Sequence, residues 1–170
     1  DKQDPNENLT NLLSELDKIE GEHWVRLHYL HPEGITKELI NMIAKSEHII
    51  PYLDVPLQHI SDKILYSMNR RISSQEVKTI LQDLRNSISN LILRTTFLVG
   101  YPGEKEEDFL ELYNFIKEFK FDRTGIFQFF PEKNTKAAGL KEQVPEELAD
   151  ERADILEQLH AENSYIFNKQ

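Results

Sequence analysis

The sequence predicts an α/β fold in which parallel strands alternate with helices. Four segments rich in β-branched and aromatic residues are typical of strands. Between them lie segments whose apolar residues recur at helical spacing. Strands connected through helices form βαβ units, which pair in parallel with right-handed crossovers. Such units build either an open doubly wound sheet or part of a barrel, and the pattern alone leaves both open.

Each predicted strand is a short apolar run bounded by polar or turn-forming residues. The first begins at Trp24, and the second is interrupted by Pro56 shortly before its end. The third, NLILRTTFLVG, is the longest and the richest in β-branched and aromatic side chains. The predicted strands cover residues 24–30, 50–57, 90–100 and 122–130.

The predicted helices are recognised by an apolar stripe and by residues that favour a helix start. We expect Thr36 and Ser61 to cap two of them, and Ser73 or Ser74 to cap a third with Glu or Gln near the capping-box position. Pro145 suits the first turn of the last helix. The predicted helices cover residues 9–19, 34–47, 61–70, 73–88, 104–120 and 144–170.

Polar or glycine residues follow every predicted strand. In parallel α/β folds the ligand lies at the carboxyl ends of the strands, where polar side chains can reach it. We therefore expect one ligand-facing rim. Its candidates are His28 and His31 after the first strand, Gln58, His59 and Ser61 after the second, Gly100, Gly103 and Glu104 after the third, and Gln128 at the end of the fourth.

Composition excludes several classes of protein. The 170 residues include no cysteine, so the chain holds no disulfide, no thiolate nucleophile and no Cys-ligated metal. A formal net charge of -10 argues against broad nucleic-acid binding, which depends on clustered Lys and Arg. No apolar run is long enough to span a membrane, and the polar start DKQDPNENLT does not resemble a signal peptide. A cytoplasmic location is the default expectation.

Two predicted strands each carry an arginine that a hydrophobic core would not accommodate. Arg94 and Thr96 lie two residues apart and so point to one side of their strand, as do Arg26 and His28. A buried charge needs a partner, and Asp54 is a candidate for Arg94. Either these side chains line the polar interior of a barrel, or the strand faces that carry them are solvated.

The segment LVGYPGEKEEDF has two interpretations. Gly100 lets the backbone approach a ligand closely, and the following Pro-Gly makes a tight turn before a helix. Alternatively, the segment is a plain connection in which Glu104 is only an acidic residue in the first turn. It is not a phosphate-binding loop, because the Lys-Ser/Thr ending is absent.

Three histidines at strand ends raise the alternative of a metal-dependent hydrolase. His28, His31 and His59 could converge on one metal ion at the rim. However, the sequence has no HExxH motif and no HxH on one strand, so we expect each histidine to bond protein groups instead and predict no metal ligands. A serine nucleophile is excluded because no GxSxG motif occurs.

Four motifs in order resemble the radical S-adenosylmethionine methylthiotransferases. They read WVRLHYLHPEGIT, YLDVPLQHISDKILYSMNRR, LRTTFLVGYPGEKEEDF and FDRTGIFQFFPEKNT, and the resemblance runs from about His23 to the final helix. Gln58-His59-Ile60-Ser61, Trp24-Val25-Arg26 and Leu93-Arg94-Thr95-Thr96 are similar to the branch that modifies an aspartate of a small-subunit ribosomal protein (S-twelve). The branch that modifies adenosine in transfer RNA remains an alternative.

The resemblance implies a partial TIM-like radical-SAM barrel, with the later strands and their outer helices. It divides the chain into an entry loop and helix (1–22), the partial barrel (23–134), and a loop and helix (135–170) leading toward a TRAM domain. The family uses S-adenosylmethionine and two [4Fe-4S] clusters. The CxxxCxxC segment that holds one cluster would lie before residue 1, so we expect the isolated chain to be an inactive fragment.

The resemblance also assigns roles to individual residues. The turn after the third strand packs against the cofactor, and the end of the second strand meets its ribose. Arg94 and Arg26 are expected to line the lumen, where a carboxylate of the cofactor or the substrate could pair with them. The adenine would be bordered by Phe127 and Phe129, or by Gln128 if the other side of that strand faces the lumen. The assigned cofactor residues are Gln58, His59, Ser61, Arg94, Thr96, Gly100, Gly103, Glu104 and Gln128, and the assigned lumen residues are Arg26, His28 and Asp54.

The implied reaction adds a methylthio group to the β-carbon of the aspartate. The partner is then a ribosomal protein, with no membrane and no broad nucleic-acid contact. A partial barrel also leaves two strand edges exposed, which makes pairing into a dimer possible. A non-enzymatic α/β module that docks a protein partner through its rim is the alternative from another class.

Overall fold

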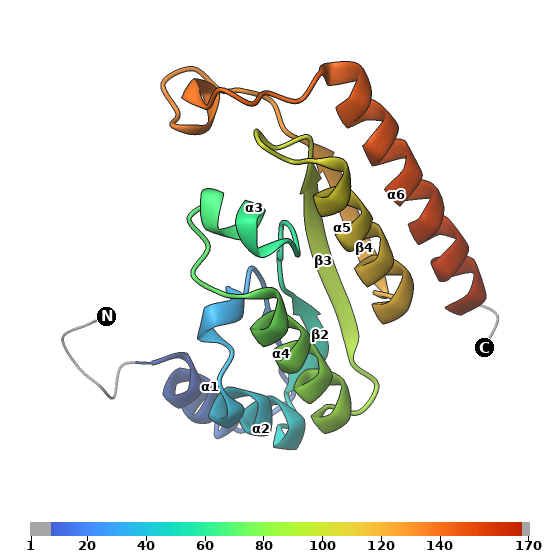
Figure 1. Ribbon diagram of the computed structural model, residues 1–170. Helices are drawn as coiled ribbons and strands as arrows, with labels where there is room; N and C mark the ends of the chain where they lie inside the picture. Colours follow the sequence, from blue (N-terminus) through green and yellow to red (C-terminus); the bar gives the residue numbers. More distant parts are fainter. Residues whose placement is uncertain (1–7, 168–170) are drawn as a thin grey trace.

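The computed structural model describes residues 8–167 and contains one four-stranded parallel sheet. The strand order β1-β2-β3-β4 follows the chain, and helices connect the strands, as the sequence predicts (Figure 1). The strands are β1 (Val25–Leu27), β2 (Ile49–Asp54), β3 (Ile92–Val99) and β4 (Arg123–Gln128). The α-helices are α1 (Leu9–Asp17), α2 (Lys37–Lys45), α3 (Asp62–Ser67), α4 (Ser74–Ser87), α5 (Glu106–Phe119) and α6 (Glu146–Phe167).

All four strands are shorter than predicted, and β1 and β2 show why. β1 pairs with β2 only around Val25 and Leu27, with an irregular register, and Trp24 before it is 85% exposed. β2 ends at Asp54, because Pro56 has no N–H to donate to the sheet. The chain returns to β3 at Gln58, whose N–H donates to Thr96 O and whose carbonyl accepts from the N–H of Leu98, both at 2.8 Å.

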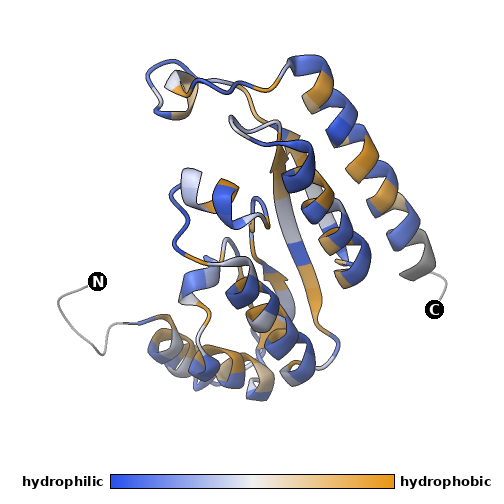
Figure 2. Cartoon of the chain, viewed as in Figure 1, coloured by the Kyte–Doolittle hydropathy of each residue, from blue (hydrophilic) through white to orange (hydrophobic). Residues whose placement is uncertain are grey.

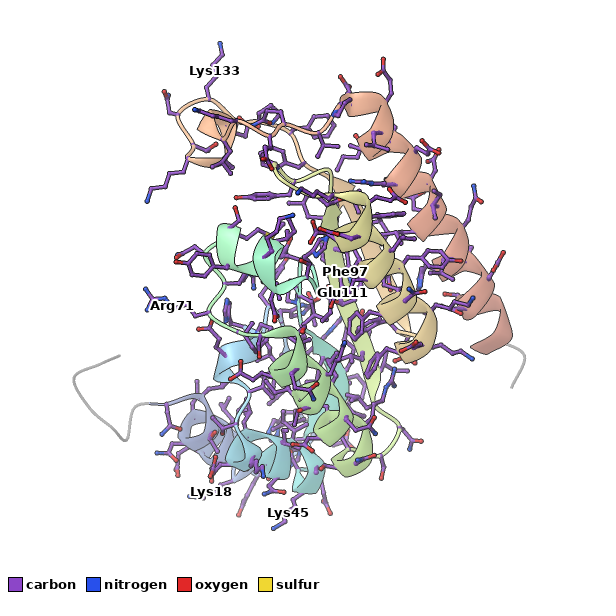
Figure 3. All side chains as sticks on the ribbon, viewed as in Figure 1. Lys18, Lys45, Arg71, Phe97, Glu111 and Lys133 are labelled. Carbon is purple, nitrogen blue, oxygen red and sulfur yellow. The ribbon has the colours of Figure 1, made fainter. Side chains whose placement is uncertain are left out.

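The two faces of the sheet differ, and β3 shows the difference most clearly. Leu93, Thr95, Phe97 and Val99 are fully buried, whereas the alternate residues are only partly buried. The buried face packs against apolar residues of the helices; these include Leu39, Ile43, Leu81, Leu84, Leu112, Phe115, Ile116 and Leu156. Phe97 lies in this interior, while Lys18, Lys45 and Lys133 project from the periphery (Figure 3). We call the opposite, partly exposed side the open face.

Helix α6 belongs to the same packed unit as the sheet. Its apolar residues contact the core, and its hydrophobic turns alternate with hydrophilic ones along its length (Figure 2). It packs on β4 and α5. Among residues 8–167 no helix combines the length and apolar character that crossing a bilayer requires.

Local capping explains where several helices begin and end. The Thr36 hydroxyl accepts from the N–H of Leu39, and Ser73 forms a reciprocal capping box with Glu76, as predicted. The helix after Ser61 is different. Ser61 occupies the N-cap position of α3, but its hydroxyl does not bond that helix and donates instead to Asp108 of α5.

Candidate functional site

On the open face, strands β2 and β3 carry the pair of opposite charges that the sequence predicts. Asp54 and Arg94 are register partners on β2 and β3, and Nη1 of Arg94 donates to Oδ1 of Asp54 at 2.9 Å. The carboxylate is 2% exposed, so this charge-assisted bond supplies the partner that burial demands. Arg26 lies next to them, with its guanidinium 4.3 Å from the centre of the Tyr52 ring. A charged, hydrogen-bonded surface therefore occupies this part of the sheet.

Toward the carboxyl ends of the strands from these charges, Gly125 has no side chain on the open face, and we call the position that its Cβ would occupy the opening. Gly125 is the register partner of Thr96, and Phe127 is the partner of Leu98. A Cβ at Gly125 would lie 3.1 Å from the Phe127 ring and 3.6 Å from Oγ1 of Thr96. The same position is 3.9 Å from Nη2 of Arg94. An aromatic ring that is 56% exposed, a hydroxyl and a guanidinium thus border this position.

The register settles which parity of β4 faces this opening. Gln128 pairs with Val99, so it lies on the helix-covered side, and its side-chain amide hydrogen-bonds Asp150 of α6. The sequence analysis assigns Gln128 to the cofactor, but the structure places it on the opposite side of the sheet from Phe127. Phe129, beyond the end of β4, has its ring 5.1 Å from that of Tyr101. Only Phe127 of these three is a register partner on the open face.

Gln58 forms an isolated bridge to β3 opposite Phe97, and its backbone is held in an unusual conformation. Its φ of 72° is in the left-handed region, which costs a non-glycine residue about 1 kcal/mol. Backbone bonds on both sides to β3 hold it there, next to Thr96 and Leu98. Strain held by surrounding structure is common at ligand sites. Gln58 is half-buried, and its prediction as a cofactor residue stays a prediction.

His59, by contrast, belongs to a buried polar network behind the rim. It is 0% exposed, and its Nδ1 accepts from the N–H of Ser61 at 3.0 Å. Because Nδ1 accepts, the ring proton resides on Nε2, which lies 3.6 Å from Oε2 of Glu104. That separation is too long for a normal hydrogen bond, and Nε2 is otherwise unpartnered. The same carboxylate oxygen accepts from the N–H of Gly100 at 3.0 Å.

Arg152 of α6 also belongs to this network, although it is not among the residues predicted from the sequence. Its Nη1 donates to Oε1 of Glu104 at 2.7 Å, and its side chain is 3% exposed. The sequence does contain an indication that Arg152 is buried, because this residue interrupts an apolar stripe at helical spacing. The other members of that stripe are Ala149, Ala153, Leu156 and Leu159.

A second buried link runs through Asp108. Its Oδ1 accepts from the hydroxyl of Ser61 at 2.6 Å, and its Oδ2 accepts from Lys63 at 2.6 Å and from the N–H of Lys105 at 2.9 Å. Burial alone would raise the pKa of Asp108, but the hydrogen bonds from Lys63, Ser61 and Lys105 outweigh it, so the pKa is lowered. Ser61 therefore joins the loop after β2 to helix α5.

This carboxylate should make stability depend on pH in the acid range. A lowered folded-state pKa contributes stability that is present above the unfolded-state value of 3.8 and is lost as pH falls through the folded value. Asp108→Asn is therefore expected to destabilise the protein at neutral pH, and the difference from wild type should shrink below pH ~4. Urea unfolding at several pH values measures this difference.

The matched control is Glu107→Gln, in the same helical turn but exposed. It removes a carboxylate that is favourable near a helix N-terminus but that lacks these buried partners. We expect it to change the free energy of unfolding by ~0.5 kcal/mol at neutral pH. A loss for Asp108→Asn that is the same at every pH would contradict the assignment.

The remaining candidates occupy separate positions. Gly100 and Gly103 have positive φ values of 74° and 87°, and the N–H of Gly103 donates to the carbonyl of Glu142. His28 is exposed beside Tyr29. His31 lies 3.2 Å from Arg70, which is the donor. In the part of the chain that the structure describes, no group of three or more His, Cys, Asp or Glu residues is arranged to hold a metal ion.

These observations define the class of protein. Parallel strands carry helices on one face and polar groups on the other, the arrangement of one segment of a TIM-like barrel. Over residues 3–116 the sequence matches the Radical SAM superfamily. The match covers most of the chain, and the chain therefore belongs to this superfamily.

Its relatives include enzymes with one shared name. The ribosomal protein uS12 methylthiotransferase RimO of Carboxydothermus hydrogenoformans is 46% identical over 161 residues, which make up 95% of this chain and 37% of that protein. The protein of the same name from Alkaliphilus oremlandii is 50% identical over 136 residues, or 80% of this chain and 31% of that protein. The chain thus spans only a minor part of the length of these relatives.

Solved structures agree on the fold. Coproporphyrinogen III oxidase (HemN) of Escherichia coli, described as a radical SAM enzyme, matches with a TM-score of 0.68 at 17% identity over 92% of this chain and 37% of that one. SuiB of Streptococcus suis matches with a TM-score of 0.53 at 20% identity over 95% of this chain and 33% of that one. At these identities the likeness concerns the fold alone.

Proposed function

We propose that this chain is part of the catalytic barrel of a methylthiotransferase that modifies an aspartate of a small-subunit ribosomal protein. The supporting observation is the 39–50% identity to enzymes named as uS12 methylthiotransferases. The motifs that carry this likeness include the strand ends at which the open face is built. A cytoplasmic location accords with such a substrate.

The open face fits S-adenosylmethionine. We assign its amino-acid carboxylate to Arg94, whose Nη1 is held by Asp54 while Nη2 lies beside the opening at Gly125. The exposed ring of Phe127 offers a stacking surface for adenine, and Thr96 and Gln58 offer polar groups for the ribose. When bound, S-adenosylmethionine would supply radical chemistry for modification of the aspartate β-carbon. The residues of this chain bind it, orient it and exclude water.

An iron–sulfur cluster does not fit the residues of this chain. The 170 residues contain no cysteine, and thiolates are the ligands that such clusters require. We therefore assign the ligands of both proposed clusters to the rest of the full-length protein. The charge of -10 suits a basic ribosomal substrate, with Arg26 and His28 near its point of entry. The exposed strand edges are assigned to pairing with other parts of the full-length protein or with a second copy.

The experiment is to express the full-length protein anaerobically with reconstituted clusters and to supply ribosomes or transfer RNA. Mass spectrometry of the ribosomal protein should show addition of one methylthio group on aspartate. Modified adenosine in the transfer RNA would instead indicate the second branch of the family. A protein that binds ribosomes but neither cleaves S-adenosylmethionine nor modifies either substrate would be a binding module.

Arg94→Met in the full-length protein should weaken binding of S-adenosylmethionine about 10- to 100-fold. This range corresponds to the loss of one charge-assisted hydrogen bond to a carboxylate. Equilibrium dialysis with labelled cofactor measures the dissociation constant. Arg71→Met is the control, because Arg71 is exposed and lines a separate cleft between α2 and α4. Equal affinities of the two variants for S-adenosylmethionine would show that Arg94 does not bind the cofactor.

A further inference from the structure

The turn that follows β3 is held in place from the last helix of the chain. Arg152 of α6 reaches Glu104 with Nη1, bonding the carboxylate at 2.7 Å and the backbone carbonyl at 3.3 Å. Its Nη2 contacts Glu106 at 3.2 Å, and its guanidinium lies 5.2 Å from the centre of the Phe109 ring. One buried side chain of α6 therefore bonds both the turn after β3 and the start of α5.

Glu104 passes this constraint to the end of the strand. Its Oε1 pairs with Arg152, while its Oε2 accepts from the N–H of Gly100, the first residue beyond β3. Gly100 has a φ of 74°, and the hydrogen bond fixes it in that conformation. A continuous path of short polar contacts thus runs from α6 through Glu104 to the carboxyl end of β3.

Packing reinforces the same path. A Cβ at Gly100 would lie 2.5 Å from Cβ of Ala149, so α6 rests directly on the turn. Figure 1 shows the start of α6 beside the loop between β3 and α5. Residues 149 and 152 lie three apart and hence on one face of the helix. A small shift of α6 must move the turn.

Stability alone is a weak reason for such a buried ion pair. Apolar residues of similar volume often stabilise a fold as well as a buried pair does, because desolvation of both charges is costly. Nε of Arg152 also has no partner, so the arrangement is not optimal for stability. The ion pair between Arg152 and Glu104 is better explained by a need to hold α6 and the turn after β3 in one relative position.

We propose that Arg152 is a positioning residue for cofactor binding. Acting through Glu104, it fixes the turn from Gly100 to Glu104 at the carboxyl end of β3. That turn then sets the position of residues 96–99 and of the polar groups on the open face. This inference rests on the proposed function, because it requires that S-adenosylmethionine binds at this end of the sheet.

The test is a double-mutant cycle in the full-length protein with reconstituted clusters. Arg152→Met and Glu104→Gln each break the ion pair from one side, and the double variant replaces it with a neutral pair. We expect each single variant to raise the dissociation constant for S-adenosylmethionine at least fivefold. The double variant should be no worse than the poorer single one, because both act through one link. The KM for the cofactor should rise more than kcat falls.

The control is Leu159→Ala, which cuts a buried side chain from the same stripe of α6 without touching the turn. It tests whether a loss of stability alone weakens binding, so all affinities are measured well below each variant's melting temperature. We expect its dissociation constant to stay within about twofold of wild type, a small difference in binding free energy. Equal weakening by Leu159→Ala, or additive effects in the cycle, would overturn the proposal.

Three further outcomes are decisive. If Arg152→Met does not fold, the comparison of Glu104→Gln with the double variant decides, and unchanged affinity in both overturns the inference. If wild-type protein neither binds nor cleaves S-adenosylmethionine, the proposed function itself fails. If the wild-type protein binds S-adenosylmethionine and the variants bind it equally well, the proposed function stands and only the proposed role of Arg152 is wrong.

Discussion

Replacing Phe97 by alanine should lower the free energy of unfolding by about 3–5 kcal/mol, the usual cost of removing a buried phenylalanine side chain. Phe97 is 0% exposed, and its ring meets those of Phe115 and Phe121 edge to face, at centroid distances of 6.3 and 5.6 Å. The cavity would open between β3 and α5, where packing leaves little room to collapse. Equilibrium urea unfolding measures the loss as a lower midpoint at an unchanged m-value.

Phe127→Ala is the matched control, because it removes the same side chain from the other face of the same sheet. Phe127 is 56% exposed, so its loss should change the free energy of unfolding by only ~0.5 kcal/mol. In the full-length protein it should instead weaken S-adenosylmethionine binding. If the two variants lose similar stability, the division into a helix-covered face and an open face is wrong.

The sequence predicts the parallel sheet because its signals are local and repeated. Four segments typical of strands are separated by segments with helical apolar stripes, which predicts βαβ units and hence parallel pairing. The parity of Arg94 and Thr96, together with the cost of an unpaired charge, correctly leads to Asp54. The short β1 was beyond prediction, because its length depends on an irregular register with β2 rather than on its own residues.

The buried network was not predicted, because its members are distant in sequence. His59 comes from the loop after β2, Glu104 from the turn after β3 and Arg152 from helix α6, and nothing local shows that they meet. Sequence reasoning therefore placed the polar residues after β2 and β3 together on a ligand-facing rim. The structure divides them: Gln58 is half-buried and bridges to β3, whereas His59, Ser61 and Glu104 are buried and bond protein groups. Their roles toward a cofactor stay predictions.

The second large effect is expected at Gly100. Gly100→Ala should lower the free energy of unfolding by about 2–4 kcal/mol, since overpacking and a left-handed backbone each cost ~1–2 kcal/mol. The new methyl group would lie 2.5 Å from Cβ of Ala149, and a φ of 74° disfavours any residue with a Cβ. Urea unfolding measures the loss, with Gly34→Ala as the control. No atom lies within 4 Å of a Cβ at Gly34, so that variant should stay within ~0.5 kcal/mol of wild type.

Combining Gly100→Ala with Ala149→Gly separates the two causes. Ala149→Gly removes the methyl group that Gly100→Ala would strike, but it alone should cost ~1 kcal/mol because glycine is a poor helix former. The double variant should be more stable than the sum of the single losses, by the ~1–2 kcal/mol assigned to the clash. The backbone strain at position 100 would persist. Strictly additive losses would show that α6 does not rest on the turn after β3, and the path from Arg152 to the open face would then lose its support.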